Sequence, residues 1–270
     1  MNGLFRLDGK HVVLTGGSGI LGQHFARGAL QQGAILSLID QNEEALHQFV
    51  EQLNPQSQQK IYMKLCDVSH SDSVEEAVFD IEEKMGPIHV LHNNAASKSK
   101  NPKDFFEKDE DFSVELWDQI MSVNLTGMFL MARAVMSRMR ENRVRGSVIQ
   151  TASIYGHVAP DQRIYEGSEY MGLQISSPAV YSASKAGVIG LTKYLAARWG
   201  EHGIRVNTLT PGGVESGQNQ RFKDQYSARV PLGRMAKAEE MVGAMVFLAS
   251  DASSYVTGHN LMVDGGLSCW

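Results

Sequence analysis

A tyrosine and a lysine at helical spacing are the residues of this chain best suited to acid–base chemistry. Tyr181 and Lys185 lie four positions apart, so on a helix they share one face, with Cβ atoms roughly 5–6 Å apart. A phenol titrates near pH ~10, and a neighbouring lysine cation stabilises the phenolate and lowers that pKa. The pair therefore predicts a tyrosine that exchanges a proton with a substrate near neutral pH.

The pair is a weak signal by itself, because exposed helices often carry both residues at this spacing. Lowering the tyrosine pKa by about 3 units requires roughly 4 kcal/mol, which is more than one exposed charge contributes. A dry site and a bound cationic cofactor would have to supply the remainder. The hypothesis therefore concerns a whole site, and the rest of the chain has to position it.

Short apolar runs alternate with longer amphipathic stretches along most of the chain, which indicates alternating strands and helices. The expected strands are His11–Thr15, Ile35–Ile39, Ile61–Leu65, His89–His92, Ser147–Gln150, Arg205–Leu209 and Asn260–Val263. The expected helices are Gly22–Gln32, Glu43–Leu53, Ser71–Met85, Ser113–Glu141, Ala179–His202 and Ala238–Ser250. This order predicts an α/β fold, a doubly wound parallel sheet between two helix layers, in a single domain over residues 1–270.

Polar residues follow nearly every expected strand, at the position where such sheets bind ligands. They are Thr15–Gly22, Asp40, Asp67, Asn93–Asn94, Ser153 and Pro211–Gly213. Because the carboxyl ends of parallel strands meet at one edge of the sheet, these side chains are expected to converge there. That convergence makes the tyrosine–lysine pair a candidate active site.

A glycine-rich turn follows the first strand and precedes a helix, which is typical of dinucleotide binding. Gly16 and Gly19 let the backbone approach a ligand closely, and the helix N-terminus after them favours a pyrophosphate. Ser18, Ile20 and Leu21 lie in the same turn, and we expect them to contact the cofactor too.

Two aspartates at strand ends are expected to bind the adenosine half of the cofactor. Asp40 ends the second strand, where a carboxylate accepts hydrogen bonds from the ribose hydroxyls and repels a 2′-phosphate. No Arg or Lys lies within Thr15–Gly22 or directly after Asp40, so the sequence favours NAD over NADP. Asp67, after the third strand, is placed to receive the adenine amino group.

With this ordered set of motifs, the chain resembles the short-chain dehydrogenase/reductase family, in its single-domain branch. The resemblance runs from about Gly9 to Gly266 and rests on the glycine turn, Asp67-Val68, Asn93-Asn94-Ala95-Ala96, Asn124, Ser153, Tyr181 with Lys185, Pro211-Gly212 and Val263-Asp264-Gly265-Gly266. It implies a Rossmann fold that binds a nicotinamide cofactor. The further cofactor-binding residues that it implies are Val68, Asn94, Ala95, Pro211, Gly212 and Val214, together with Tyr181 and Lys185.

The resemblance also implies four catalytic roles. Tyr181 is the general acid in ketone reduction and the base in alcohol oxidation, while Lys185 lowers its pKa and binds the nicotinamide ribose. Ser153 hydrogen-bonds the substrate oxygen, and Asn124 holds a water that links Lys185 to solvent. Three of these residues have a simpler alternative role: Ser153 could cap a turn, Asn124 could hydrogen-bond the backbone, and Lys185 could be a solvated charge. Hydride moves directly between nicotinamide and substrate, so no metal is required, and no His/Cys/Asp cluster has metal-ligand spacing.

Two features depart from the family pattern. Most single-domain members carry a glycine at the position of Ile20, which leaves the details of the phosphate turn open. Ser153 and Tyr181 are 28 residues apart, considerably more than is common in the family. The extra segment leaves from and returns to the catalytic face, so it is expected to cover the substrate or an oligomer interface.

Three substrate-side loops are expected at about residues 97–112, 156–178 and 213–230. The residues proposed for substrate binding are Lys98, Arg163, Tyr165 and Gly213, with Lys100 as a further loop cation. The third loop is polar, whereas steroid, retinoid or acyl-chain sites would want a more apolar lid. A sugar, sugar acid or polyol fits better, and the loops also resemble oxidoreductases of bacterial surface-glycan and nonulosonate pathways.

Other functions remain open at this point. A 3-oxoacyl-thioester reductase shares the catalytic set, and a catalytically silent nucleotide-binding regulator would share the fold. An enoyl reductase is disfavoured, because those relatives space their tyrosine and lysine more widely. The intact set of catalytic residues counts against the regulator.

We expect a cytoplasmic protein that acts on a small-molecule substrate and has no nucleic-acid or membrane partner. The net charge of −5 gives no basic excess for nucleic acid, and no apolar run approaches the ~20 residues of a membrane span. The first eight residues lack the apolar core of a signal peptide, and two cysteines make a disulfide framework unexpected. The family resemblance implies a homodimer or homotetramer built on the helices Ser113–Glu141 and Ala179–His202.

Overall fold

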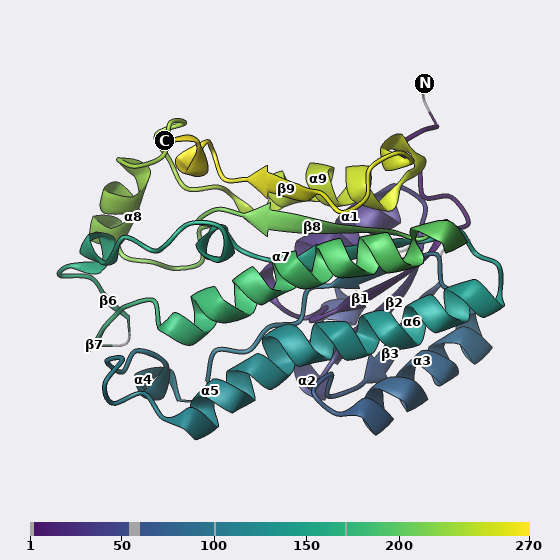
Figure 1. The fold of residues 1–270 in the computed structure, drawn as a ribbon, viewed down its shortest axis with the longest axis horizontal. Helices are drawn as coiled ribbons and strands as arrows, with labels where there is room; N and C mark the ends of the chain where they lie inside the picture. The colour runs from purple at the N-terminus through teal and green to yellow at the C-terminus, as the bar shows by residue number, and fades with distance from the viewer. Residues whose placement is uncertain (1–2, 54–59, 100, 171) are drawn as a thin grey trace.

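The computed structural model describes residues 3–53, 60–99, 101–170 and 172–270. Its centre is a seven-stranded parallel sheet in the order β3-β2-β1-β4-β5-β8-β9 (Figure 1). The strands are β1 His11–Thr15, β2 Ile35–Asp40, β3 Ile61–Leu65, β4 Val90–Asn93, β5 Ser147–Thr151, β8 Arg205–Pro211 and β9 Asn260–Val263. The seven strands expected from the sequence are confirmed, with small differences at their ends.

The inner strands are buried on both sides because helices cover both faces of the sheet. Every residue of β1, β4 and β5 is buried, whereas the edge strands β3 and β9 keep residues that are partly exposed. Two of the buried strand residues are histidines, His11 and His92, each about 1% exposed. Both are titratable groups held within the buried strand layer.

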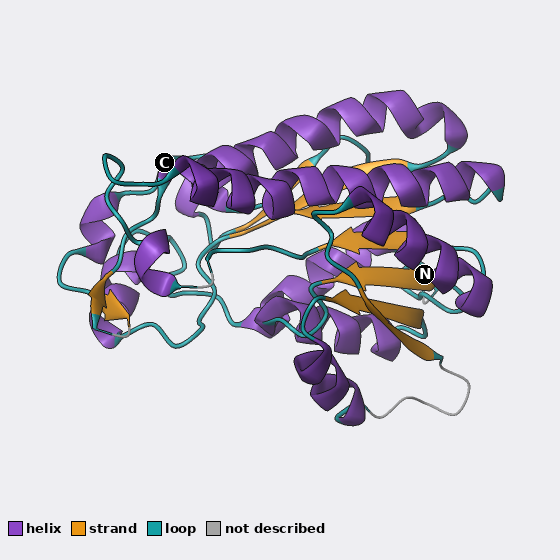
Figure 2. Ribbon diagram, turned by 90° about the horizontal axis from the view of Figure 1, so that it is seen from below, coloured by secondary structure: helices purple, strands orange, loops and turns teal. Residues whose placement is uncertain are grey.

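Helices form a layer on each face of the sheet, so the predicted doubly wound, three-layer architecture is confirmed (Figure 2). One layer consists of α1 Ile20–Gln31, α2 Glu43–Glu51 and α9 Val242–Ala249, which contribute Phe25, Leu46 and Met245 to a common core. The other layer consists of α3 Ser71–Met85, α6 Met128–Glu141 and α7 Ala179–Trp199, which contribute Val78, Met131 and Leu195. Short 3-10 helices lie at Ile154–Gly156, Gln162–Tyr165, Gly200–His202, Ala238–Met241, Asp251–Ser253 and Leu267–Cys269.

The direction of winding reverses between β1 and β4, which lie side by side at the centre of the sheet. In open sheets of this kind the crevice at such a reversal is where ligands bind. Here Thr15 ends β1, and its hydroxyl oxygen accepts hydrogen bonds from the backbone N–H groups of Asn94 and Ala95, each at 3.0 Å. The two loops that flank the crevice are therefore held together.

The helix expected over Ser113–Glu141 is continuous but irregular. It consists of α5 Val114–Met121, a π-helical turn over Ser122–Gly127, and α6. By length and composition the stretch Val114–Glu141 could cross a membrane, but 56% of its most apolar window is buried inside the protein. It packs against the sheet and α3, which explains its apolar character.

One end of the molecule carries elements that the sequence interpretation treated as loops. β6 Glu169–Tyr170 and β7 Leu173–Gln174 form a small antiparallel hairpin, and α8 Gln220–Ser227 lies beyond the ends of β8 and β9 (Figure 1). α4 Pro102–Phe105 lies in the loop that follows β4. The three expected substrate-side loops thus contain secondary structure that their polar composition did not predict.

Candidate active site

The glycine turn after β1 has the shape that a pyrophosphate needs. Gly16 has a φ of +66°, and a Cβ there would lie 2.9 Å from the Cα atom of Ala95. A Cβ on Gly22 would overlap the carbonyl oxygen of Gly16. Helix α1 begins after Gly19 with no side-chain cap and no acidic residue in its first turn. Its free N–H groups and positive dipole end therefore fit the anionic part of a dinucleotide cofactor.

Asp40 is drawn into this turn. One oxygen of its carboxylate accepts hydrogen bonds from the backbone N–H of Ser18 at 3.0 Å and from the Ser18 hydroxyl at 2.7 Å. The other accepts from the backbone N–H of Asn42 at 3.1 Å. Ser18 therefore orients Asp40, and its hydroxyl is occupied there rather than pointing to a phosphate. A carboxylate has about four acceptor positions, so Asp40 can still accept a further hydrogen bond.

The other cofactor candidates line the same crevice. Asp67 accepts hydrogen bonds from the backbone N–H and hydroxyl of Ser69 at 2.9 and 2.7 Å. Val68 packs directly on Gly127 of the π-helical turn, where a Cβ would lie 2.9 Å from the valine side chain. The Asn94 side chain donates to the carbonyl oxygens of Thr15 and Gly16, both at 3.2 Å. The Asn94 side chain thus holds the backbone of the glycine turn in place.

The residues at the end of the sheet nearest the catalytic helix belong to β8 and the turn after it. Pro211 ends β8, and the Gly212 backbone N–H donates to the Val263 carbonyl oxygen at 2.9 Å. Val214 pairs with Ala236 in an isolated bridge and packs on the core that contains α1. At the start of α1, Ile20 is 56% exposed and Leu21 is partly buried. Both side chains are therefore accessible at the glycine turn.

Ser153 and Tyr181 meet at the carboxyl end of β5. Ser153 follows this strand and is 8% exposed, and Tyr181 lies in the first turn of α7. Burial raises the pKa of Tyr181, and a hydrogen bond with the Ser153 side chain lowers it in part. The Ser153 oxygen also accepts a long hydrogen bond of 3.3 Å from the Tyr155 backbone N–H, so it caps the next turn as well.

Lys185 lies beneath Tyr181 and is 2% exposed. Its ammonium group donates to the Thr151 carbonyl oxygen at 2.9 Å and lies 6.0 Å from the centre of the Tyr181 ring. Burial lowers the pKa of Lys185 to about 8. A carbonyl partner does not neutralise the positive charge of Lys185 as a carboxylate would. In a site that excludes water this charge stabilises a Tyr181 phenolate strongly.

We expect Lys185→Met to stabilise the fold while it removes activity. The folded pKa of Lys185, about 8, lies below the usual ~10.4, so the unfolded chain binds this proton more tightly. Burial of the charged lysine therefore lowers the free energy of unfolding. This loss is present in full below pH ~8 and disappears above pH ~10.4. Allowing for the lost hydrogen bond, the free energy of unfolding at neutral pH should rise by about 1–2 kcal/mol.

Urea unfolding at pH ~7 and ~10 measures this effect, and an NAD-coupled assay measures the lost activity. Lys193→Met, at an exposed position of the same helix, is the matched control. A variant that is less stable than wild type at both pH values would contradict the electrostatic argument.

Asn124 lies in the π-helical turn and is fully buried. Its side-chain oxygen accepts from the Ser97 backbone N–H at 2.7 Å, and its amide donates to the Ser97 carbonyl oxygen at 3.1 Å. The side chain therefore fixes the loop after β4, which is the simpler alternative weighed for it. A water bound by Asn124 stays a prediction.

The residues expected to bind substrate separate into two groups. Tyr165 is 9% exposed and Gly213 lies against the ring of Tyr226, so both are packed inside the end of the molecule that carries the β6–β7 hairpin and α8. Arg163 makes two hydrogen bonds to Asp161, with 77% of its side chain exposed. Arg163 is already neutralised there and does not enter the site proposed below.

Lys98 is the remaining substrate candidate. Much of its side chain is exposed, while the protein around its ammonium group lowers the pKa of Lys98. Among the described residues it has no hydrogen bond or ion pair. It is therefore free to meet an anionic group. Lys100 lies outside the described residues.

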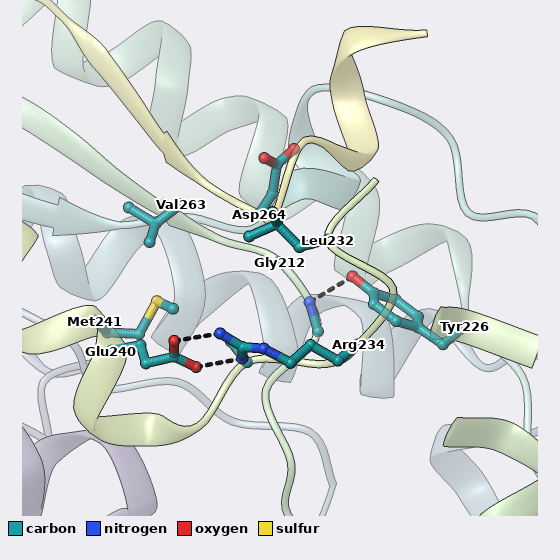
Figure 3. A pocket seen from close by; sticks show the side chains of 11 residues that line it. Gly212, Tyr226, Leu232, Arg234, Glu240, Met241, Val263 and Asp264 are labelled. Carbon is teal, nitrogen blue, oxygen red and sulfur yellow. Dashed lines mark hydrogen bonds and ion pairs between the residues drawn. The ribbon is translucent and has the colours of Figure 1, made fainter. Parts of the chain in front are cut away.

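A cavity of about 180 Å³ adjoins the ends of β8 and β9 (Figure 3). It is lined by Gly212, Gly213, Tyr226 and Asp264 on one side and by the Arg234–Glu240 ion pair on the other. None of the four catalytic candidates lines it. Its importance lies in Tyr226, whose hydroxyl oxygen accepts a hydrogen bond from the Gly213 backbone N–H (Figure 3).

Sequence reasoning missed two features of this end of the molecule. Phe222 and Tyr226 are buried, at 7% and 2% exposure, and their helical spacing within a polar segment could have revealed one apolar face. Tyr155 lies two residues after Ser153 and is partly buried beside Tyr165. Its nearness to a catalytic residue was the only sequence signal for it.

A dinucleotide turn at the switch point and a tyrosine–serine–lysine group beside it define a nicotinamide-dependent oxidoreductase. Residues 17–268 match a family model described as enoyl-(acyl carrier protein) reductase. A ribulose-forming D-arabinitol 2-dehydrogenase of Candida tropicalis is 34% identical, with 98% of this chain and 95% of that protein covered.

Two solved structures extend the comparison. A gluconate 5-dehydrogenase from Burkholderia cenocepacia, in complex with NADP and tartrate, is 31% identical, covers 99% of this chain and 98% of its own, and has a TM-score of 0.84. A short-chain dehydrogenase from Leptospira borgpetersenii with bound NAD+ is 31% identical, with coverage of 97% and 94% and a TM-score of 0.85. The chain belongs to the short-chain dehydrogenase/reductase family, whose NAD(P)-dependent members act on CH–OH and C=O groups.

Proposed function

We propose that this enzyme transfers a hydride between NAD(H) and a carbinol or carbonyl carbon of a polyol, sugar or sugar acid. The observation that carries the reaction is the contact between Ser153 and Tyr181 above the buried cation of Lys185. The substrate class is supported by relatives named for arabinitol and gluconate and by the polar residues around the site.

The protein's own residues handle the proton and the substrate oxygen. In alcohol oxidation the Tyr181 phenolate takes the carbinol proton, and the Ser153 hydroxyl holds the same oxygen in place. Lys185 stabilises the phenolate through its charge. A bound dinucleotide would supply the hydride acceptor through its nicotinamide. Its pyrophosphate would lie along Gly16–Leu21, its adenosine ribose at Asp40 and its adenine at Asp67. In ketone reduction Tyr181 returns its proton to the oxygen.

A panel of polyols, keto-sugars and sugar acids tests the substrate class with purified protein and NAD(H). We expect turnover of at least one polyol or sugar acid, and none of a 3-oxoacyl thioester. Preferred turnover of the thioester would favour the alternative reductase. Tight NADH binding without turnover of any substrate would favour a nucleotide-binding regulator.

We also propose that NAD is preferred over NADP, because Asp40 ends β2, where a carboxylate would accept hydrogen bonds from the ribose hydroxyls and repel a 2′-phosphate. Asp40→Ala should lower the ratio of NADP to NAD dissociation constants at least tenfold, since both a hydrogen-bond acceptor and a like charge are removed. Titration of each nucleotide by tryptophan fluorescence gives the two constants. Asp109→Ala, at an exposed position, is the control, and an unchanged ratio in Asp40→Ala would reject this role.

The cellular setting and assembly are proposals of the same kind. We place the enzyme in the cytoplasm as a homodimer or homotetramer without nucleic-acid or membrane partners. The helices spanning 114–141 and 179–199 are the proposed contact surfaces. Light scattering in solution measures the number of subunits.

A further inference from the structure

Two segments that lie far apart in the sequence form one cap at the catalytic end. We define the cap as residues 161–170, which belong to the segment between Ser153 and Tyr181, together with residues 219–229 around α8. Tyr165 of the first segment stacks on Phe222 of the second, with ring centres 5.5 Å apart. Arg229 binds Asp161 across the two segments at 2.8 Å. The segments therefore pack as one unit with its own apolar core.

The cap is tied to the catalytic machinery at both of its roots. The Gln162 side chain pairs with the backbone of Ser177, donating at 2.9 Å and accepting at 3.4 Å, just before α7 begins. On the other side, the Tyr226 hydroxyl binds the Gly213 backbone N–H. A Cβ on Gly213 would overlap the Tyr226 ring. The positions of the cap tyrosines are thus fixed relative to Tyr181.

The hydroxyls of Tyr155 and Tyr165 face one another where the cap meets the segment after β5. The Tyr165 hydroxyl lies 3.4 Å from the Tyr155 hydroxyl, which is longer than the ~2.7–2.8 Å of a good O–H···O bond. Tyr165 also contacts the Ser177 hydroxyl, whereas Tyr155 has no other side-chain partner among the described residues. The pair thus retains hydrogen-bonding capacity, with Tyr155 only two residues from Ser153.

Burial keeps these two hydroxyls protonated. Burial raises the pKa of both Tyr155 and Tyr165, and negative charge on Tyr181 raises both further. The field of a Tyr181 phenolate therefore reaches each of them. Because they stay neutral when Tyr181 ionises, they can donate as well as accept hydrogen bonds.

We propose that the hydroxyls of Tyr155 and Tyr165 together bind a second hydroxyl of the substrate, on the carbon next to the one that is oxidised. This inference rests on the proposed function and specifies how that site recognises a polyol. An alcohol hydroxyl donates one hydrogen bond and accepts up to two, so it can bridge an O–H pair that is too widely spaced for a good mutual bond. The two tyrosines would then orient the reacting carbinol under Ser153 and Tyr181.

Removing one hydroxyl at a time tests the proposal. For a polyol that wild type oxidises, Tyr155→Phe and Tyr165→Phe should each lower kcat/KM about tenfold, the usual effect of one lost hydrogen bond. For the mono-deoxy analogue, which lacks the neighbouring hydroxyl, both variants should match wild type. Each variant keeps its ring, so NADH affinity and melting temperature should stay at wild-type values. Tyr255→Phe, at a fully exposed position, is the control.

The outcomes separate the inference from the proposed function. Equal losses on the polyol and on its deoxy analogue would mean that the hydroxyls only support the fold, and would overturn the inference. Unchanged kcat/KM for the polyol in both variants would overturn it too. If wild type oxidises no polyol or sugar acid at all, the proposed function fails first, and the inference falls with it.

Discussion

Replacing Tyr181 with phenylalanine should lower turnover about a thousandfold, the usual contribution of a positioned acid–base group. The ring would still pack against α5 and the loop after β4, and only the hydroxyl that exchanges the proton is lost. Because Lys185 and the glycine turn are untouched, we expect the affinity for NADH to fall by about tenfold at most, the effect of one lost hydrogen bond.

The matched control for this prediction lies on the same helix. Tyr194 belongs to α7 but is 64% exposed, so Tyr194→Phe should retain full turnover. Single-turnover kinetics with NAD and the best polyol separates the chemical step from binding. Full activity in Tyr181→Phe would show that the proton is handled elsewhere and would remove the basis of the proposed mechanism.

The second large effect is a loss of stability in mild acid, caused by two buried histidines. His11 contacts the Ser37 hydroxyl and the Gly86 carbonyl oxygen at 2.8 and 3.0 Å, and burial lowers its pKa to about 4. His92 packs against Phe25 with the ring planes tilted and the ring centres 4.5 Å apart, and burial lowers its pKa to about 3. In the unfolded chain both titrate near pH ~6.5.

The sign of the effect follows from these values. Above pH ~6.5 both histidines are neutral in either state and contribute no pH dependence. Below pH ~6.5 both histidines are protonated in the unfolded chain but stay neutral in the folded protein. The free energy of unfolding therefore falls by about 1.4 kcal/mol per pH unit for each histidine. Between pH ~6.5 and ~4.5 the loss is about 5 kcal/mol, a large part of the 5–15 kcal/mol of a typical domain.

Urea unfolding followed by circular dichroism across this pH range measures the slope. His11→Asn removes one titrating group, and its free energy of unfolding should depend on pH less steeply by about 1.4 kcal/mol per unit. His47→Gln, at an exposed position, should leave the slope unchanged. A stability that is constant from pH ~7 to ~5 would contradict the assignment of these histidines as buried and neutral.

Much of the fold was predictable because strand and helix patterns are local. His11–Thr15 and Ile35–Asp40 are short apolar runs followed by polar residues, and parallel strands covered on both faces require that pattern. Tyr181, Lys185 and Ser153 could be chosen as catalytic candidates because the chemistry restricts residue type, spacing and order along the chain. Asp40 was placed correctly at the strand end, but its bond to Ser18 depends on the three-dimensional turn.

The cap was not predictable, because its contacts join residues of separate segments. Tyr165 and Phe222 carry no mutual signal in the sequence, and their stacking depends on how the segment before α7 returns to the sheet. The polar residues of 213–221 are mostly exposed, whereas Phe222 and Tyr226 are buried on the inner face of α8. Composition cannot distinguish the two sides until a packing partner exists.

The α/β fold, the family and the four catalytic candidates could be predicted from the amino-acid sequence, because each depends on local periodicity or on an ordered set of residue types. The environment of those four residues depends on tertiary packing. Lys185 is buried and hydrogen-bonds a carbonyl group, Asn124 hydrogen-bonds Ser97, and the hydroxyls of Tyr155 and Tyr165 come together. Desolvation and contacts between distant segments arise only when the chain is folded, so these properties had to come from the structure.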